Sequence, residues 1–434
     1  MLTPKSWDRR RKSVHRIYGA VVATMLLATV SFGQDAGASE QETIRLLVQQ
    51  VKELQEKVKA LEAQQNNAPA SPGSQTAVST SVEPTPQNPP EAMPPLPHEM
   101  HGIHWLGFGE VDYKVLDQRK PELGMFGFNP GSARNFFIGD FDLFLTSRIN
   151  DKTEVLSEIV FGEDADQTFD VDLERMLLKY DYNDHLRLSF GRYHNDVSYY
   201  NMVYHSGRWL QTAVDRPLIA EYTNDGGLLP TQAIGISVQG LLPSGALGLN
   251  YVLEYGTSDT TRPDINGSGE INHENNGNHV LAGIFARPDY APGLEIGGSF
   301  YHDQISNEHV TPAQRFDQSL LNAHVVYTSH GIEILNEAFL MRHAEIGGPL
   351  ILNMPAFYTQ FAKSFGRIRP YFRFQYINAN PQSVYNDVLL RYGPSFGARY
   401  DFNDNVAFKT QLDHTIRKGE PDLNGLQFQL AFTF

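Results

Sequence analysis

The chain ends in the stretch LQFQLAFTF, residues 426–434. Large apolar residues alternate along it with small or polar ones. One face holds Leu426, Phe428, Leu430, Phe432 and Phe434, and the other holds Gln427, Gln429, Ala431 and Thr433. This alternation predicts a β-strand with one apolar face. In water that face would lie in a protein core, whereas in a membrane barrel it would face lipid and the polar face would line the lumen.

The same alternation recurs along residues 101–434. Residues 186–190, 247–255, 372–376 and 406–413 mostly place apolar side chains on one face and polar residues or glycine on the other. Charged residues fall repeatedly in mid-strand on the polar face. A β-sandwich would require two apolar inner faces of comparable extent, so the lengths of the connections are needed to choose between the two folds.

Seven short turns alternate along the chain with eight longer polar loops, which together join sixteen strands. The turns lie near 150–151, 183–184, 243–245, 291–293, 329–331, 365–367 and 403–405. The loops lie near 114–133, 162–168, 193–230, 257–278, 303–314, 344–355, 379–387 and 417–424. Short turns, long loops and an even strand number are typical of outer-membrane barrels. The sequence therefore predicts an all-β fold, a 16-stranded antiparallel transmembrane β-barrel over 101–434 that ends in the aromatic Phe434.

An apolar run, residues 17–30, follows a basic stretch near the N-terminus. It is too short to cross a bilayer core, and small and polar residues follow it, which is the pattern of a secretory signal peptide. We assign residues 1–33 to this signal. The mature chain is expected in the bacterial outer membrane, with its N-terminal segment in the periplasm. Because the chain has no cysteine, no disulfide can stabilise it.

Residues 39–65 are predicted to form a short α-helical coiled coil. Its a and d positions are Ile44, Leu47, Val51, Leu54, Val58 and Leu61. β-Branched residues at a with Leu at d favour a dimer. Residues 66–100 are rich in proline and predict a stiff, extended linker. Such a segment could tether the outer membrane to the peptidoglycan of the cell wall.

The net negative charge of the chain, −15, lies in the predicted barrel. Residues 101–434 carry 25 Lys and Arg against 40 Asp and Glu. Nucleic acid is disfavoured as a partner, because duplex binding requires a basic stripe. The excess of carboxylates is consistent either with solvated loops or with an acidic pore lining.

Three short motifs stand in the barrel region: FGRY at 190–193, DRP at 215–217 and GISVQG at 235–240. With the predicted barrel, they resemble bacterial porins, nearest the phosphate-selective porin (O/P) family. The resemblance implies a homotrimeric channel with inward-folded loops, embedded in outer-membrane lipid and passed by small hydrophilic solutes. Phosphate-selective members line their pores with Arg and Lys, and this acidic barrel departs from that pattern.

The third loop, about 193–230, is the longest. The resemblance implies that it folds into the lumen and narrows it, and irregular backbone is tolerated at membrane depth where it lines water or packs on protein. Its expected constriction residues are Tyr204, His205, Arg208, Asp215, Arg216, Glu221 and Asp225. An external loop packed on its own aromatic residues is the alternative.

Strand parity predicts the charged lining of the lumen. The acidic set is Asp140, Asp142, Glu154, Glu158, Asp170, Asp172 and Glu174, and the basic set is Arg187, Arg369 and Arg373. Charged walls set selectivity in aqueous pores, although these charges could instead pair and stabilise the wall. Arg175 falls on the lipid-facing parity, which predicts a β-bulge or a shifted strand boundary nearby.

The sequence thus predicts a passive channel for small hydrophilic solutes or ions, with a weak preference for cations. An anion- or phosphate-selective porin is the alternative, and a structural tether is an alternative of another class. No enzymatic activity, cofactor or metal site is expected. Residues 393–397 fit G-x-S-x-G, but they lie in an alternating strand rather than at the strand–turn–helix elbow that this motif requires.

Overall fold

The structure, a computed structural model, describes residues 102–118, 134–163, 169–204, 207–221, 227–259, 262–263, 270–271, 278–307, 314–383, 385 and 388–434. The signal peptide predicted at 1–33, the coiled coil at 39–65 and the linker at 66–100 lie outside the described residues.

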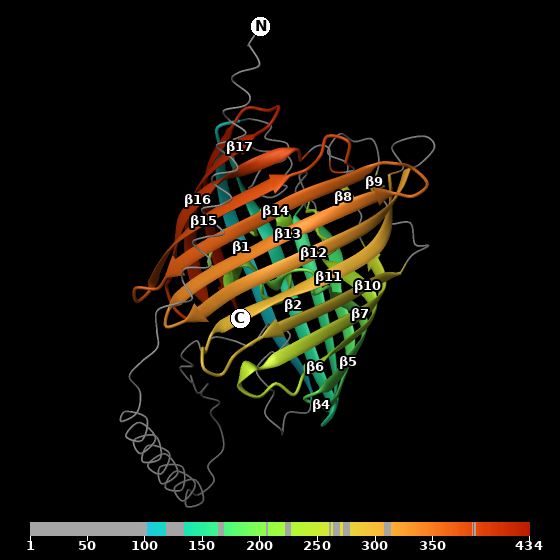
Figure 1. The fold of residues 1–434 in the computed structure, drawn as a ribbon. Coiled ribbons are helices and arrows are strands. Elements are labelled where there is room, and N and C mark those ends of the chain that lie inside the picture. The colour runs from blue at the N-terminus through green and yellow to red at the C-terminus, as the bar shows by residue number, and fades with distance from the viewer. Residues whose placement is uncertain are drawn as a thin grey trace, which may run out of the picture. The chain divides into compact units, whose positions relative to one another are not determined.

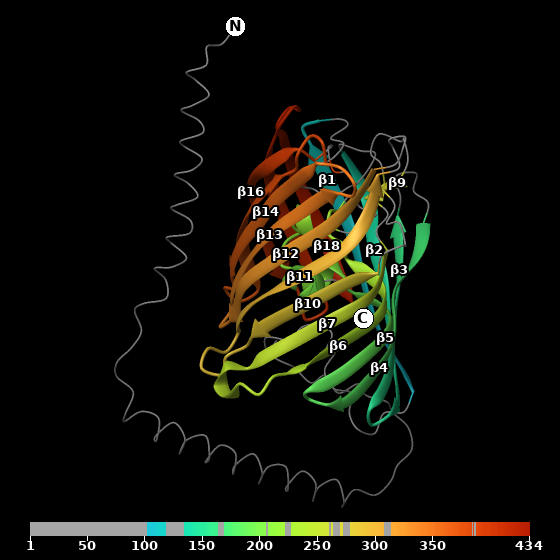
Figure 2. The same ribbon diagram turned by 45° about the vertical axis from the view of Figure 1, so that its right-hand side comes forward.

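Within the described residues, sixteen antiparallel strands form one closed barrel, because β1 pairs with β18 (Figures 1 and 2). The strands are β1 (Ile103–Leu116), β2 (Arg134–Asn150), β3 (Thr153–Glu163), β4 (Phe169–Asn183), β5 (Leu186–His194), β6 (Gln232–Leu241), β7 (Leu249–Asp259), β10 (His279–Ala286), β11 (Leu294–Asn307), β12 (Gln314–Ser329), β13 (Ile332–Glu345), β14 (Ile351–Lys363), β15 (Ile368–Asn378), β16 (Leu390–Asp401), β17 (Val406–Arg417) and β18 (Leu423–Thr433). The short strands β8 (Arg262–Pro263) and β9 (Glu270–Ile271) pair only with each other. The predicted 16-stranded barrel is confirmed.

The connections alternate between the two ends of the barrel, as predicted. The shortest turns, 151–152, 184–185 and 330–331, lie at one end. At the opposite end, the loop predicted at 344–355 is shorter than expected. β13 extends to Glu345 and β14 begins at Ile351, so only five residues connect them. Since the strand number is even, β1 begins and β18 finishes at the short-turn end, where the backbones of Gly107 and Phe434 exchange hydrogen bonds of 2.9 and 3.0 Å.

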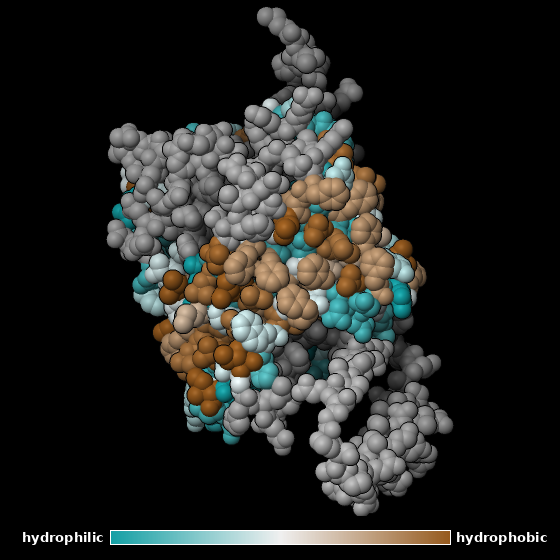
Figure 3. Space-filling view, turned by 180° about the vertical axis from the view of Figure 1, so that it is seen from behind, coloured by the Kyte–Doolittle hydropathy of each residue, from teal (hydrophilic) through white to brown (hydrophobic). Residues whose placement is uncertain are grey.

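Large apolar side chains cover the outside of the barrel. The most exposed include Trp105, Phe136, Met176, Ile234, Leu253, Ile284, Leu321, Phe396, Leu412 and Phe434. Figure 3 shows such residues gathered in a broad patch on the face turned away from the viewer of Figure 1. Water would make so large an exposed apolar surface unfavourable, whereas lipid accommodates it. The barrel therefore spans a membrane. Among the described residues, no helix is long and apolar enough to do so.

Four register shifts interrupt the described strand pairs, and the two that lie away from the short turns change which residues face inward. Between β3 and β4 the register shifts, so that Glu158 pairs with Arg175 and Ile159 pairs with Leu173. Glu174 is the extra residue of this bulge, and both Glu174 and Arg175 are buried inside the barrel. The bulge predicted from the parity of Arg175 is confirmed. A second register shift lies between β1 and β2 at Gly109 and Val111.

Gly191 on β5 has a backbone conformation that other residues rarely adopt, with φ of 129°. A Cβ atom added there would lie 1.9 Å from the carbonyl oxygen of Met176 on β4. We expect Gly191→Ala to destabilise the barrel by about 1–3 kcal/mol, because it combines backbone strain with a backbone clash. The measurement is the fraction of folded, heat-modifiable protein on a gel after refolding. Gly162→Ala is the control, since among the described residues its added Cβ would meet only Asp140 Oδ1, at 3.7 Å. Equal folded fractions would contradict the prediction.

Candidate functional site

The described parts of the third loop, residues 195–204, 207–221 and 227–231, lie inside the barrel. They contain the short helix α3 (Tyr199–Val203) and the 3₁₀ turns η1 (Arg208–Leu210) and η2 (Leu218–Ala220). The wall residues that bond it come from strands around the whole barrel: Asp142, Glu254, Glu333, Glu337, Arg369, Arg373, Arg399, Lys409, Gln411, Gln427 and Gln429. Figures 1 and 2 show α3 and its neighbouring turns within the ring of strands.

Glu337 on β13 holds the start of this loop. Its carboxylate accepts hydrogen bonds from the backbone N–H groups of Tyr199 and Tyr200 at 2.8 and 2.9 Å. The Ser198 hydroxyl donates to it at 3.0 Å, and Ser198 is also the N-cap of α3. On the wall side, Tyr358 donates to the same carboxylate at 2.6 Å and Asn322 at 3.0 Å. One buried carboxylate thus accepts five donors and fixes the first turn of α3, whose free N–H groups need acceptors.

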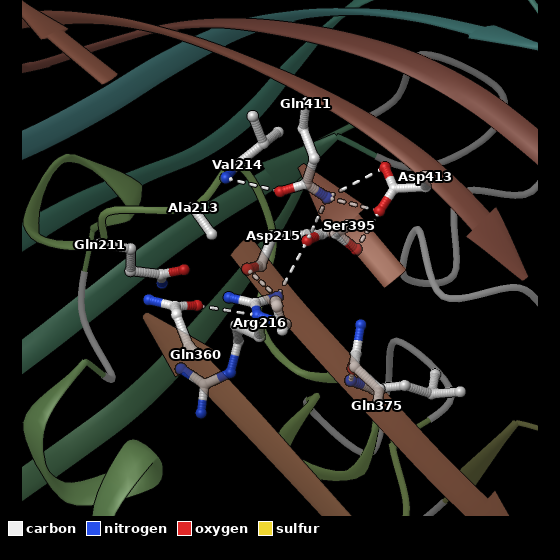
Figure 4. A network of polar contacts seen from close by, with 12 residues as sticks. Gln211, Ala213, Val214, Asp215, Arg216, Gln360, Gln375, Ser395, Gln411 and Asp413 are labelled. Atoms are coloured by element: carbon white, nitrogen blue, oxygen red, sulfur yellow. Dashed lines mark hydrogen bonds and ion pairs between the residues drawn. The ribbon is translucent and has the colours of Figure 1, made fainter. Parts of the chain in front are cut away.

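Side chains of β15 to β18 bind the extended segment that follows η1, and Figure 4 shows one of these contacts, between Val214 and Gln411. Arg399 donates to the carbonyl oxygen of Gln211 at 3.0 Å, and Lys409 donates to that of Ala213 at 3.1 Å. The Val214 N–H donates to Gln411 at 3.3 Å, and its carbonyl accepts from Gln429 at 3.2 Å. The wall thus supplies the hydrogen bonds that irregular backbone needs at membrane depth.

Asp215 is the centre of the polar network in Figure 4. Arg373 Nη1 lies 3.2 Å from its carboxylate and 2.9 Å from its carbonyl oxygen. Gln411 and Gln427 donate to the two carboxylate oxygens at 2.9 and 3.1 Å. Arg373 is 0% exposed and also donates to Gln360. Removing one member of such a pair leaves an uncompensated buried charge, which costs about 3–5 kcal/mol.

Arg216 links separate parts of the third loop to one another. It is 0% exposed and donates to the carbonyl oxygens of Ala220 at 2.7 Å and Tyr204 at 2.9 Å. Its guanidinium lies 5.2 Å from the centre of the Tyr200 ring. Burial raises the pKa of Tyr200 to about 12 although Arg373 and Arg216 oppose the shift, so this phenol stays neutral. It donates to Gln211 at 3.1 Å.

Part of the barrel interior is apolar, which the polar lumen lining expected from strand parity did not include. Inward side chains of β10 to β15 pack against the loop in one hydrophobic cluster. The wall contributes Leu281, Tyr301, Leu320, Leu335, Phe339, Met341, Met354 and Ile377, and the loop contributes Val197, Tyr199, Leu218, Ile219, Leu228 and Leu229. A loop that enters the lumen must bury its own apolar residues, and these inward positions give it a core to pack on.

The predicted acidic residues lie on β2 to β4, and several are buried rather than open to a lumen. Asp142 accepts a hydrogen bond from the Gly207 N–H of the loop. Glu158 is 2.6 Å from Arg175, and the buried Glu174 accepts from Gln232. The inward-facing carboxylates that keep partial exposure are Asp140, Glu154 and Asp172. The side chain of Asp170 lies outside the described residues.

The predicted basic residues separate into two groups. Arg369 and Arg373 contact the loop, and Arg369 donates to Thr212 at 3.2 Å. Arg187 is 51% exposed near the short-turn end, where it lies 3.7 Å from Asp184 and contacts no loop residue among the described ones. Its inward parity alone could not place it along the length of the lumen.

The predicted constriction residues are brought together only in part. Tyr204 donates to Glu333 at 3.3 Å, and Arg208 lies 3.6 Å from Glu221. His205 and Asp225 lie outside the described residues. Four wall residues that bind the loop were not among the predicted site residues: Glu333, Glu337, Arg399 and Lys409. The signal for them was available, since all four are charged and lie on the inward parity of their strands.

No protein-family model matches this sequence, and no curated protein matches it. Solved structures with a similar fold include a loop L8 deletion mutant of OmpT, an outer membrane protein of Vibrio cholerae (13% identity, 77% of this chain and 99% of that chain, TM-score 0.50). The anion-selective porin from Comamonas acidovorans is similar at 10% identity over 77% and 99% of the two chains, with a TM-score of 0.52. The outer membrane channel DcaP of Acinetobacter baumannii is similar at 10% identity over 76% and 97%, with a TM-score of 0.53. The chain therefore shares the fold of these porins and channels.

Glu337 should control how tightly the third loop is held. We expect Glu337→Gln to weaken the loop anchor by about 1–3 kcal/mol, because a neutral amide offers one acceptor oxygen to donors that now share two charged ones. The measurement is trypsin cleavage after Arg208 in the folded protein, which should become faster. Glu345→Gln, at the rim of the same strand, is the control. Identical cleavage rates in the two variants would argue against the anchor.

Proposed function

We propose that this chain is a bacterial outer-membrane porin, a passive channel through which small hydrophilic solutes diffuse. The observation that carries the proposal is the third loop held inside a closed, lipid-facing barrel by inward side chains. Charged side chains at membrane depth are unfavourable unless they face a polar partner or water. The inward-facing charges of this barrel therefore favour a polar passage through it. The similarity in fold to solved porins supports the same conclusion.

The proposed orientation puts the short turns and both ends of the barrel in the periplasm and the longer connections outside the cell. This is the usual arrangement of such barrels. The chain would assemble as a homotrimer in outer-membrane lipid, as its resemblance to porins implies. The tether hypothesis rests on residues 39–100 alone and can coexist with a channel.

We propose a weak preference for cations. Asp140, Glu154 and Asp172 are acidic, inward-facing and partly exposed. The basic residues nearest the loop are engaged in holding it: Arg373 is bonded to Asp215, and Arg399 and Lys409 are bonded to loop carbonyls. A charge that is buried and bonded to the loop contributes less to the potential of the lumen than a charge that is exposed to water there. The preference should fade with salt, because the Debye length is about 10 Å at 0.1 M.

The alternative is an anion- or phosphate-selective porin. It would require a basic site open to solute, and the partly exposed candidates include Arg192, Arg208 and Arg369. Arg208 lies 3.6 Å from the carboxylate of Glu221. Arg192 lies 3.7 Å from Asp172 and donates to Gln232. The acidic partner of Arg192 therefore favours the cation-preferring channel.

Conductance in a planar lipid bilayer tests the proposal. The purified protein should give stepwise currents that rise with salt, and the reversal potential under a KCl gradient should have the sign of cation preference. Failure to conduct would contradict the porin assignment. A clear anion preference would keep the porin and favour the phosphate-selective alternative.

Asp172 should contribute to that preference, because its side chain is 46% exposed. We expect Asp172→Asn to lower the permeability ratio of K⁺ to Cl⁻ by about twofold, since a screened charge at a wet surface contributes less than about 1 kcal/mol. Asp289→Asn, in an exposed short turn, is the control and should leave the ratio unchanged. An unchanged permeability ratio in Asp172→Asn would show that this residue does not contribute to the cation preference.

A further inference from the structure

A row of hydrogen-bonding side chains crosses four neighbouring strands on the outside of the barrel. His302 on β11 is paired with Ser319 on β12, Ser319 with Arg342 on β13, and Arg342 with Asn353 on β14. These strands lie side by side on the face toward the viewer in Figure 1. We call these four residues the polar row.

The polar row faces outward. Arg342 and Asn353 are exposed and His302 and Ser319 are half-buried, whereas their neighbours along each strand are buried inside the barrel. Those inward neighbours include Tyr301, Gln318, Met341, His343 and Leu352. Because side chains alternate along a strand, the row belongs to the lipid-facing surface.

The polar row lies at the edge of the outer apolar surface that is farther from the short turns. Two residues nearer the short turns, the corresponding row is Phe300, Leu321, Leu340 and Pro355. Ten residue steps along β13 separate Ile332, at the short turn, from Arg342. They span about 33 Å along the strand and about 23 Å along the barrel axis for a tilt near 45°. That height matches the apolar band of about 25 Å in such barrels, so the row lies at headgroup depth.

Arg342 has no hydrogen bond or ion pair with any other described residue. His302, by contrast, is held to Ser319 by a contact of 3.1 Å between Nδ1 and Oγ. A free guanidinium directly beside lipid is unfavourable unless it reaches a polar partner. Its planar donors match phosphate oxygens in pairs, and phosphate groups are the anionic partners that a lipid headgroup layer provides at this depth.

We propose that the polar row is a binding site for the phosphate group of an outer-leaflet lipid, with Arg342 as the charged contact and His302, Ser319 and Asn353 as neighbouring polar contacts. The proposal rests on the orientation given under the proposed function, in which this end of the barrel faces outward. Adjacent strands are about 4.8 Å apart, so the four positions span about 14 Å. That width suits a phosphorylated sugar headgroup.

Native mass spectrometry of the purified full chain, titrated with diphosphorylated lipid A, tests the site. The wild type should bind this lipid more tightly than the dephosphorylated form. Arg342→Leu should weaken binding by about fivefold, the size expected for one charge-assisted contact at a wet surface. Lys363→Leu is the matched control, because Lys363 faces outward on β14 at the short-turn end and donates to the carbonyl of His330.

Equal binding by wild type and Arg342→Leu would overturn the proposal. Equal binding of the phosphorylated and dephosphorylated lipids would also overturn it, because the surface would then hold acyl chains only. Conductance of Arg342→Leu should equal that of the wild type, since the row is outside the lumen. A wild type that binds the lipid but fails to conduct would refute the proposed function and leave the lipid site standing.

Discussion

Satisfaction of backbone hydrogen bonds at membrane depth is the constraint on which this structure depends. In the wall it is met by closing the sheet, because pairing β1 with β18 leaves no strand edge open to lipid. In the lumen it is met by side chains. Glu337 accepts the first N–H groups of α3, and Arg399, Lys409 and Gln429 donate to carbonyl oxygens of the following segment. An irregular loop can therefore persist where no regular ladder is available.

This use of side chains changes what the charges of the lumen mean. Arg373 would be an anion site on an open wall, but its partner is Asp215 of the loop. Carboxylates on β13 and cations on β15 to β17 act as anchors, while Asp140, Glu154 and Asp172 keep access to water. For selectivity, the distinction between buried charges that anchor the loop and charges exposed to water therefore matters more than the net charge of the barrel.

The outer surface follows a simpler rule, since lipid replaces the protein core as the apolar environment. Mostly apolar side chains fill the outward positions between the short turns and the row at His302, Ser319, Arg342 and Asn353. Asn336 and Thr359 are polar exceptions, and they satisfy each other through a hydrogen bond of 2.6 Å. Strand β13 thus carries a loop anchor, Glu337, on its inner face and a candidate lipid contact, Arg342, on its outer face. The period of two makes these roles independent of each other.

The sequence by itself determined the sixteen strands, their inward and outward faces and the bulge near Arg175. These features follow from the alternation of apolar and polar residues and from the positions of turn residues, which are local properties of the chain. The sequence also pointed to the third loop as the functional segment. Only the tertiary structure decided which inward residues meet that loop: Glu337 and Arg373 contact it, whereas Arg187 stands near the turns. It likewise decided that part of the interior is an apolar core formed with Leu218 and Ile219. Parity gives the side of the wall on which a residue lies, but height along the lumen and partners distant in sequence depend on how the loop folds within the closed barrel.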